Sequence, residues 1–300
     1  MPSNNQRLCD KPMSLLDALL LDPYRINVWI AYRTDGVAGT GTQNDPYDGS
    51  TATKFDAIMN SLAASTTVHL GPTTSTNPFT TTGFWTTSDG STGSGWQPKA
   101  AMRIVGSGID VTTLKLTGAV DPSGSLTRHY FAIGHALSST MIDYFDVSEL
   151  TIDCNLAQTG TKFACGAVRV MGNHARTRRI KVINWGKKAS GPDCFVITMI
   201  TADPASAAMA VIDTGIEDCI AIQADANTSS PITVFHAGPK DDSGSNAEGF
   251  ATGPFIRNCF CDCAALTNPL TFDIRGLSMA WCKAGIVEGN QVHNTKYGGP

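Results

Sequence analysis

The chain has 300 residues, of which 42% are hydrophobic and 16% are charged, and its formal net charge is -4. This length and hydrophobicity suit one elongated domain with a sizeable core. The acidic balance argues against the basic surface that nucleic-acid binding requires, so we predict no nucleic-acid partner. The sequence contains no run of about 18 apolar residues and no recognisable secretory signal, so we expect no membrane span.

The first 38 residues are expected to lead into a β-domain over 39–300. Within this lead-in, the mostly apolar run of residues 27–32 predicts a short strand. A helix is predicted over about 51–64, where it would cover the first coil of an array of coils over about 66–294. Apolar residues at spacings of three and four form one face of this helix, namely Phe55, Ile58, Met59 and Leu62.

A stretch rich in Thr, Ser and Gly over 72–98 predicts a long loop. It contains Trp85 and Trp96, which we treat as candidate substrate-binding residues because sugars stack on aromatic rings. The alternative, which we favour, is a surface flap that these aromatic side chains hold in place.

Beyond residue 102 the sequence becomes a series of short β segments separated by Gly, Asn and Asp. Five segments superimpose, and equivalent residues recur after 30, 39, 40 and 31 positions, as in a solenoid. A turn-prone position in each segment is predicted to adopt a left-handed conformation, which Asp, Asn and Gly tolerate but Glu and Arg fit poorly. These positions are Glu149, Arg179, Asp218, Asn258 and Gly289.

The segment 103–116, with its Gly-x-Gly turn followed by an aliphatic strand, resembles an early coil of right-handed parallel β-helix proteins. The Ile256-x-Asn258-Cys259 pattern is similar to the Asn-bearing corners of pectate lyases, polygalacturonases and phage tailspikes. The resemblance covers roughly 40–294. It implies an all-β, pectin-lyase-like parallel β-helix with a short N-terminal helix, and a carbohydrate ligand.

Catalytic acids are not carried over from the polygalacturonases. Asp218 lies in a similar Asp-Cys-Ile-Ala stretch, but Glu217 replaces that family's second Asp, and its Asn-Thr-Asp and Gly-His-Gly motifs are absent. The repeat also explains Asp218 as a corner residue.

The nine cysteines show no CxxC pair, and most are expected to be small core residues. Cys259, Cys261 and Cys263 alternate, which places them on one face of a strand. We expect them to stack inside the array rather than bind a metal, and predict no metal site.

Candidate site residues lie on strands whose outward side chains would form a long flat face. If apolar residues such as Val168 and Val234 point inward, five neighbours point outward: Arg169, Thr233, Phe235, Asp273 and Arg275. Of these, Arg169 and Phe235 are candidate substrate-binding residues. Asp273 with Arg275 has residue types suited to a lyase, which would also require calcium (Ca2+). The alternative is a surface salt bridge.

A second candidate group surrounds a predicted insertion. Asp241 and Asp242 with His236 could act as acid and base in glycoside hydrolysis, and the adjacent Lys240 is a candidate substrate-binding residue. A solvated turn explains the same run without chemistry, and we favour it. The basic run 174–179 similarly suits either an anionic sugar or a charged outer strand that discourages edge pairing.

These patterns predict a polysaccharide-binding or polysaccharide-cleaving protein, either a lyase or a glycoside hydrolase if it is an enzyme. The alternative is a non-catalytic module such as a tailspike or surface-fibre component. Because no capping pattern follows the last coil, we expect a homo-oligomer such as a trimer, a partner on that end, or a longer chain. An extracellular, cell-surface or virion location fits these readings.

Overall fold

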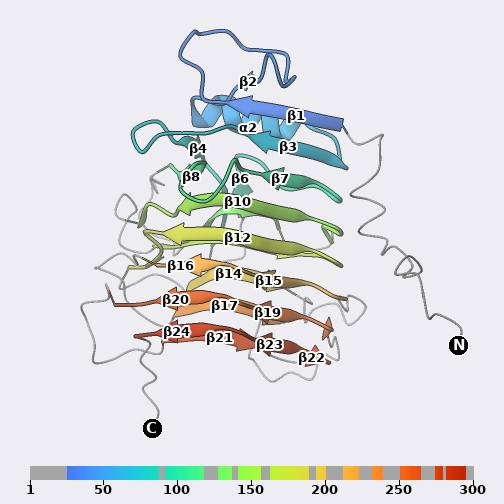
Figure 1. The fold of residues 1–300 in the computed structure, drawn as a ribbon, viewed down its shortest axis with the longest axis vertical. Coiled ribbons are helices and arrows are strands. Elements are labelled where there is room, and N and C mark those ends of the chain that lie inside the picture. The colour runs from blue at the N-terminus through green and yellow to red at the C-terminus, as the bar shows by residue number, and fades with distance from the viewer. Residues whose placement is uncertain are drawn as a thin grey trace, which may run out of the picture.

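The computed structural model describes residues 26–87, 92–117, 128–136, 141–156, 163–188, 194–200, 212–222, 232–238, 251–264, 274–279 and 282–294. Across these residues the protein is mainly β, with one helix and extended sheets of parallel strands (Figure 1). The arrangement is consistent with a β-solenoid. No helix in this part of the chain is long and apolar enough to cross a membrane.

Within the described ranges, the first sheet has fourteen strands, and all of its pairings are parallel. Its main path runs through β2 (Tyr47–Asp48), β1 (Ile26–Ala31), β3 (Thr66–Leu70), β7 (Arg103–Val105), β10 (Asp146–Asp153), β12 (Arg176–Ile183), β15 (Gly215–Glu217), β19 (Phe255–Arg257) and β23 (Ile286–Glu288). Strands β4 (Phe79–Thr81), β8 (Thr113–Leu116), β16 (Ile220–Ala221), β20 (Phe260–Asp262) and β24 (Gln291–His293) extend it. The sheet therefore already includes β1, which lies before residue 39.

In the described part of the chain the second sheet has eight strands. They pair in the order β21 (Ile274–Met279), β17 (Ile232–Gly238), β14 (Cys194–Ile200), β11 (Phe163–Met171), β9 (Arg128–Gly134), β5 (Phe84–Thr87) and β6 (Thr92–Ser94), with β13 (Gly186–Lys187) beside β11. Strands β9, β11, β14, β17 and β21 pair in parallel. A small third sheet joins β18 (Ala251–Thr252) to β22 (Cys282–Lys283). Side chains of the two large sheets form one hydrophobic core.

The register of the first sheet confirms the alignment of the five sequence segments. Leu150 pairs with Ile180, and the next aligned position continues from strand to strand through all five segments. The paired residues at that aligned position are Ile152, Val182, Ala221, Cys261 and Val292. One sequence repeat therefore corresponds to one step across the sheet.

All five predicted corner positions are left-handed. The backbone φ is 62° at Glu149, 47° at Arg179, 53° at Asp218, 50° at Asn258 and 66° at Gly289. Glu149 and Arg179 adopt this conformation although their side chains disfavour it. Their side chains form an ion pair with each other.

The predicted helix is present as α2 (Ala52–Ser61), and the hydroxyl of Thr51 accepts a hydrogen bond from the Lys54 amide at its start. Phe55 and Met59 are buried, and the Phe55 ring lies 5.8 Å from that of Phe79. The helix contacts β2 and β4 and lies near the N-terminal end of the stack of strands (Figure 1).

The prediction of a structureless loop over 72–98 is wrong. This segment contains β4, β5 and β6, and β5 pairs antiparallel with both β6 and β9. The many Thr residues, on which the loop prediction rests, are β-branched and compatible with strands.

The inward and outward assignment is wrong at Phe235, which is fully buried in the hydrophobic core. Strict alternation fails because the core contains consecutive residues on each of four neighbouring strands. These pairs are Ala132–Ile133, Ala167–Val168, Val196–Ile197 and Val234–Phe235. A local irregularity of this kind shifts the inward positions by one residue, and a period-two pattern misses it.

The cysteines of the alternating cluster lie in the core, as predicted. Cys259, Cys261 and Cys263 are each at most 2% exposed. Burial raises the pKa of the Cys219 thiol, and a hydrogen bond with Cys259 in the neighbouring strand adds to this effect.

Candidate functional site

The strongest candidate site is the outer face of the first sheet. On β7, β10 and β19 one paired row belongs to the core, at Ile104, Val147 and Ile256. Because side chains alternate along a strand, the residues on either side of this core row face away from it. We call the central part of this surface the arginine face, which comprises Arg103, Asp146, Ser148, Arg176, Arg178, Glu217, Phe255 and Arg257.

The register places these residues in two rows. In the first, Arg103 pairs with Asp146 and Asp146 with Arg176, and the row continues through Gly215 to Phe255. The second row lists, in order, Val105, Ser148, Arg178, Glu217, Arg257 and Glu288. Successive strands are about 4.8 Å apart, so both rows are straight and closely spaced.

A nearly buried carboxylate lies between two arginines of this face. Asp146 Oδ2 is 2.9 Å from Arg178 Nη2, and its Oδ1 is 3.8 Å from Arg103 Nε. The Asp146 side chain is 7% exposed, against 28% for Arg103 and 19% for Arg178. Within the described part of the chain, the Nε atoms of both arginines are shielded from solvent and have no hydrogen-bond acceptor. The two side chains as a whole remain partly exposed, so both stay accessible to a ligand in part.

Two further arginines enclose an aromatic ring. The guanidinium groups of Arg176 and Arg257 lie 4.5 Å and 4.7 Å from the centre of the Phe255 ring, at cation–π distance. Arg257 also forms an ion pair with the exposed Glu288 at 2.9 Å. These contacts hold the flexible side chains in place above a buried ring.

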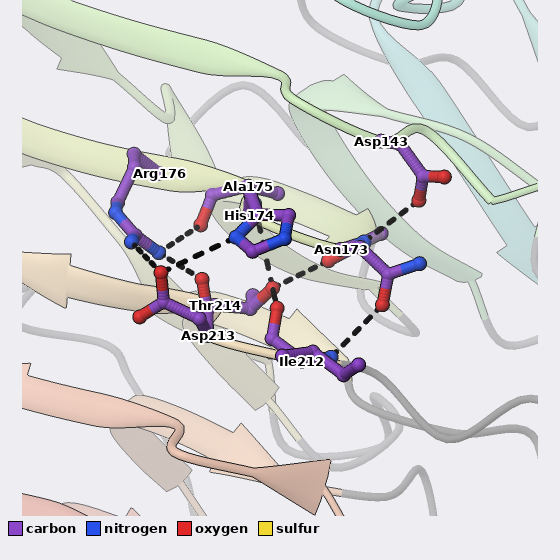
Figure 2. A network of polar contacts seen from close by, with 9 residues as sticks. Asp143, Asn173, His174, Ala175, Arg176, Ile212, Asp213 and Thr214 are labelled. Atoms are coloured by element: carbon purple, nitrogen blue, oxygen red, sulfur yellow. Dashed lines mark hydrogen bonds and ion pairs between the residues drawn. The ribbon is translucent and has the colours of Figure 1, made fainter. Parts of the chain in front are cut away.

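Figure 2 shows the polar network at the edge of this face. Asp213 Oδ2 lies 2.6 Å from Arg176 Nη2 and 3.3 Å from His174 Nδ1, and the His174 ring stacks on Tyr144. Burial opposes ionisation of Asp213, but Arg176 and His174 outweigh it and lower the pKa of its carboxyl. The network therefore fixes Arg176 from the side.

Its remaining members connect the turns that precede three neighbouring strands. Asp143 accepts a hydrogen bond from the Asn173 amide at 2.8 Å, and Asn173 Oδ1 accepts one from the Ile212 amide at 2.9 Å (Figure 2). These side chains satisfy backbone donors at the turns. Their role is structural.

Toward the N-terminal end, the second row continues through an aromatic pair. The rings of Trp29 and His69 stack with their centres 4.7 Å apart, and His69 Nε2 lies 3.0 Å from Asn27 Oδ1. Burial lowers the pKa of His69, and the charge of Arg103 acts in the same direction. At this end of the surface the second row is therefore aromatic.

The structure brings two of the predicted site residues together in the second sheet. Arg169 pairs with Thr198 and Thr198 with His236, so the two residues lie in one row, two strands apart. Both are at least 90% buried. The Arg169 guanidinium lies 5.6 Å from the centre of the Phe131 ring. This pair is covered rather than displayed on an open face.

The other predicted residues do not join them. Arg275 is exposed and pairs with Thr233 in a different row. Trp85 is half-buried with Arg128 over its ring at 4.6 Å, and Trp96 is buried, donating from Nε1 to Thr81. Four predicted residues lie outside the described residues: Lys240, Asp241, Asp242 and Asp273.

Sequence reasoning noted Arg176 and Arg178 only as part of a basic run and missed Arg103, Asp146 and Arg257. The signal was present except for Arg103, because the other residues flank the first position of a superimposed segment. Examining the flanking positions across all repeats would have identified both rows.

The face offers guanidinium donors, carboxylate acceptors and an aromatic ring along a straight line. In the described residues, no three His, Cys, Asp or Glu side chains are grouped so as to hold a metal ion. Comparison with known proteins adds no assignment, since no family model, curated protein or solved structure matches the chain.

Proposed function

We propose that the chain is a right-handed parallel β-helix that binds a polysaccharide along the arginine face. The regular step of one strand per repeat and the left-handed residue at each aligned corner support this fold. A linear polymer suits such a surface because its own repeat can follow the rows from strand to strand.

The observation that carries the proposal is the sharing of Asp146 by Arg103 and Arg178. The two arginines come from strands two steps apart, and the carboxylate orients both. Oriented, partly exposed guanidinium groups suit hydroxyl, carboxylate or sulfate oxygens of a sugar chain. Pre-ordering them also reduces the entropy lost on binding.

We propose binding rather than cleavage as the activity of this face. The carboxylates that would serve a hydrolase or lyase were predicted at Asp241, Asp242 and Asp273, outside the described residues. The experiment that tests binding therefore also measures cleavage.

A non-catalytic structural or adhesive module is the second candidate. Its support is the exposure of apolar side chains in the last strands of the first sheet, 50% at Val287 and 37% at Val292, where aligned positions on earlier strands are buried. A partner on this end would bury them. Light scattering over a range of concentrations tests for self-association through it.

The experiment for the main proposal is a panel of pectins, alginates, glucans and bacterial capsular glycans, with and without calcium. Binding is measured by calorimetry, and cleavage by new reducing ends and unsaturated-uronate absorbance. Saturable binding of at least one polymer is expected. Folded protein that binds none of them would overturn the proposal, and unsaturated products would identify a lyase.

A further inference from the structure

We infer that the preferred ligand is an anionic polysaccharide with one acidic group per disaccharide, rather than one on every sugar. This inference rests on the proposed function and concerns the same face. Its basis is the order of charges along the two rows.

The sign of the charge alternates from strand to strand across the face. Positive side chains lie on β7, β12 and β19, and negative side chains on the strands next to them, β10, β15 and β23. In strand order the residues are Arg103, then Asp146, then Arg176 with Arg178, then Glu217, then Arg257, then Glu288.

The period of the positive charges is two strands, or about 9.6 Å at the usual strand spacing. One strand step is close to the length of one sugar in an extended chain, so the period corresponds to a disaccharide. A polymer with an acidic group on alternate sugars can place each of them beside a guanidinium group.

The intervening carboxylates provide selection against other polymers. A chain with an acidic group on every sugar would bring some of these groups next to the more exposed carboxylates, Glu217 and Glu288. Like charges at such separations disfavour binding, and specificity commonly depends on a repulsive contact of this kind. A neutral polymer could accept hydrogen bonds from the arginines but would gain no attraction between opposite charges.

The alternation of charge also creates ion pairs within the protein, but these pairs do not prevent the face from binding a ligand. Arg103 and Arg178 share the single carboxylate of Asp146. Arg176 is only 11% exposed and is held by Asp213. Arg257 and its partner Glu288 are 34% and 60% exposed. An exposed pair of this kind is weak, so a ligand carboxylate can compete for Arg257.

The test compares three polymers of equal length: an alternating uronate–N-acetylhexosamine copolymer, a homopolyuronate, and the copolymer with its carboxyl groups reduced to alcohols. We expect the alternating copolymer to bind about tenfold more tightly than either of the others, by calorimetry at low salt. Equal affinity for all three would overturn the charge-spacing inference while leaving glycan binding intact. Binding of no polymer would overturn the proposed function itself.

A variant separates repulsion from general loss of binding. Glu217→Gln removes one intervening carboxylate, so its affinity for the homopolyuronate should rise severalfold while its affinity for the copolymer changes little. Glu149→Gln, which makes the same change at a corner outside the face, serves as the control. An unchanged ratio of the two affinities in Glu217→Gln would contradict the inference.

Discussion

Arg178 and Asp146 lie on neighbouring strands with Nη2 and Oδ2 2.9 Å apart, and the carboxylate is almost completely removed from solvent. Since Arg103 approaches the same carboxylate from the other side, one acidic group holds two basic side chains in place. The order of the arginine face therefore depends on Asp146.

We predict that Asp146→Asn lowers the free energy of unfolding by about 3 kcal/mol, because it leaves two partly buried guanidinium groups without their carboxylate. Asp213→Asn should cost about 1 kcal/mol or less, since Asp213 is half-exposed and Asn tolerates its left-handed backbone. Urea denaturation measures both. Equal losses would contradict the assigned role of Asp146.

The left-handed corners predict opposite effects for two exchanges. Glu149→Gly should stabilise the protein by about 1 kcal/mol, because glycine adopts a φ of 62° without strain. Gly289→Ala should destabilise it by at least about 1 kcal/mol, since the added Cβ would lie 2.2 Å from Asn258 Oδ1. Thermal unfolding of both variants checks this, and a loss for Glu149→Gly would show that its ion pair with Arg179 outweighs the strain.

Stability should fall as the pH is lowered below about 6.5. Burial lowers the pKa of His129 well below its ordinary value of 6.5, and the charge of Arg169 adds to this effect. The unfolded chain therefore binds a proton there that the folded protein does not. This contribution to stability is present above pH 6.5 and is lost below it, by at most about 1.4 kcal/mol per pH unit.

His129→Gln should flatten the pH profile of stability between pH 7 and 5, measured by urea denaturation at each pH. His293→Gln, at an exposed site, is the control and should leave the slope unchanged. An unaltered slope in His129→Gln would show that His129 is not the group responsible.

The cysteines should differ sharply in reactivity. Burial raises the pKa of the thiols of Cys154 and Cys219, whereas Cys282 is only half-buried. Iodoacetamide should therefore modify Cys282 at least tenfold faster than the other two in the folded protein. Peptide mass spectrometry measures the rates, and rapid labelling of Cys219 would mean that its strand opens locally.

The repeats of the first sheet could be predicted because each segment is short and carries the same order of inward, outward and corner positions. Even Glu149 and Arg179 occupy the left-handed positions that alignment assigned to them. Tertiary pairing here outweighs the local preference of the side chain, which sequence reasoning had weighed against them.

The candidate site was harder to predict, for two physical reasons. In the second sheet, consecutive inward residues such as Val234 and Phe235 break the alternation, so the expected outward face was misassigned. In the first sheet, Arg103 and Asp146 are far apart in the sequence and meet only through strand register. A single segment shows a charged residue, whereas the aligned repeats show a row.

The most direct test of glycan binding by the arginine face is a comparison of Arg178→Gln with Arg179→Gln, using a polymer that binds the unmodified protein. The two arginines are adjacent on β12, but Arg179 pairs with Glu149 at the corner and lies outside the face. We predict that Arg178→Gln weakens binding about tenfold or more, as expected for a charged hydrogen bond, while Arg179→Gln changes it less than twofold. Equal affinities for the two variants, with both folded, would contradict the assignment of binding to this face.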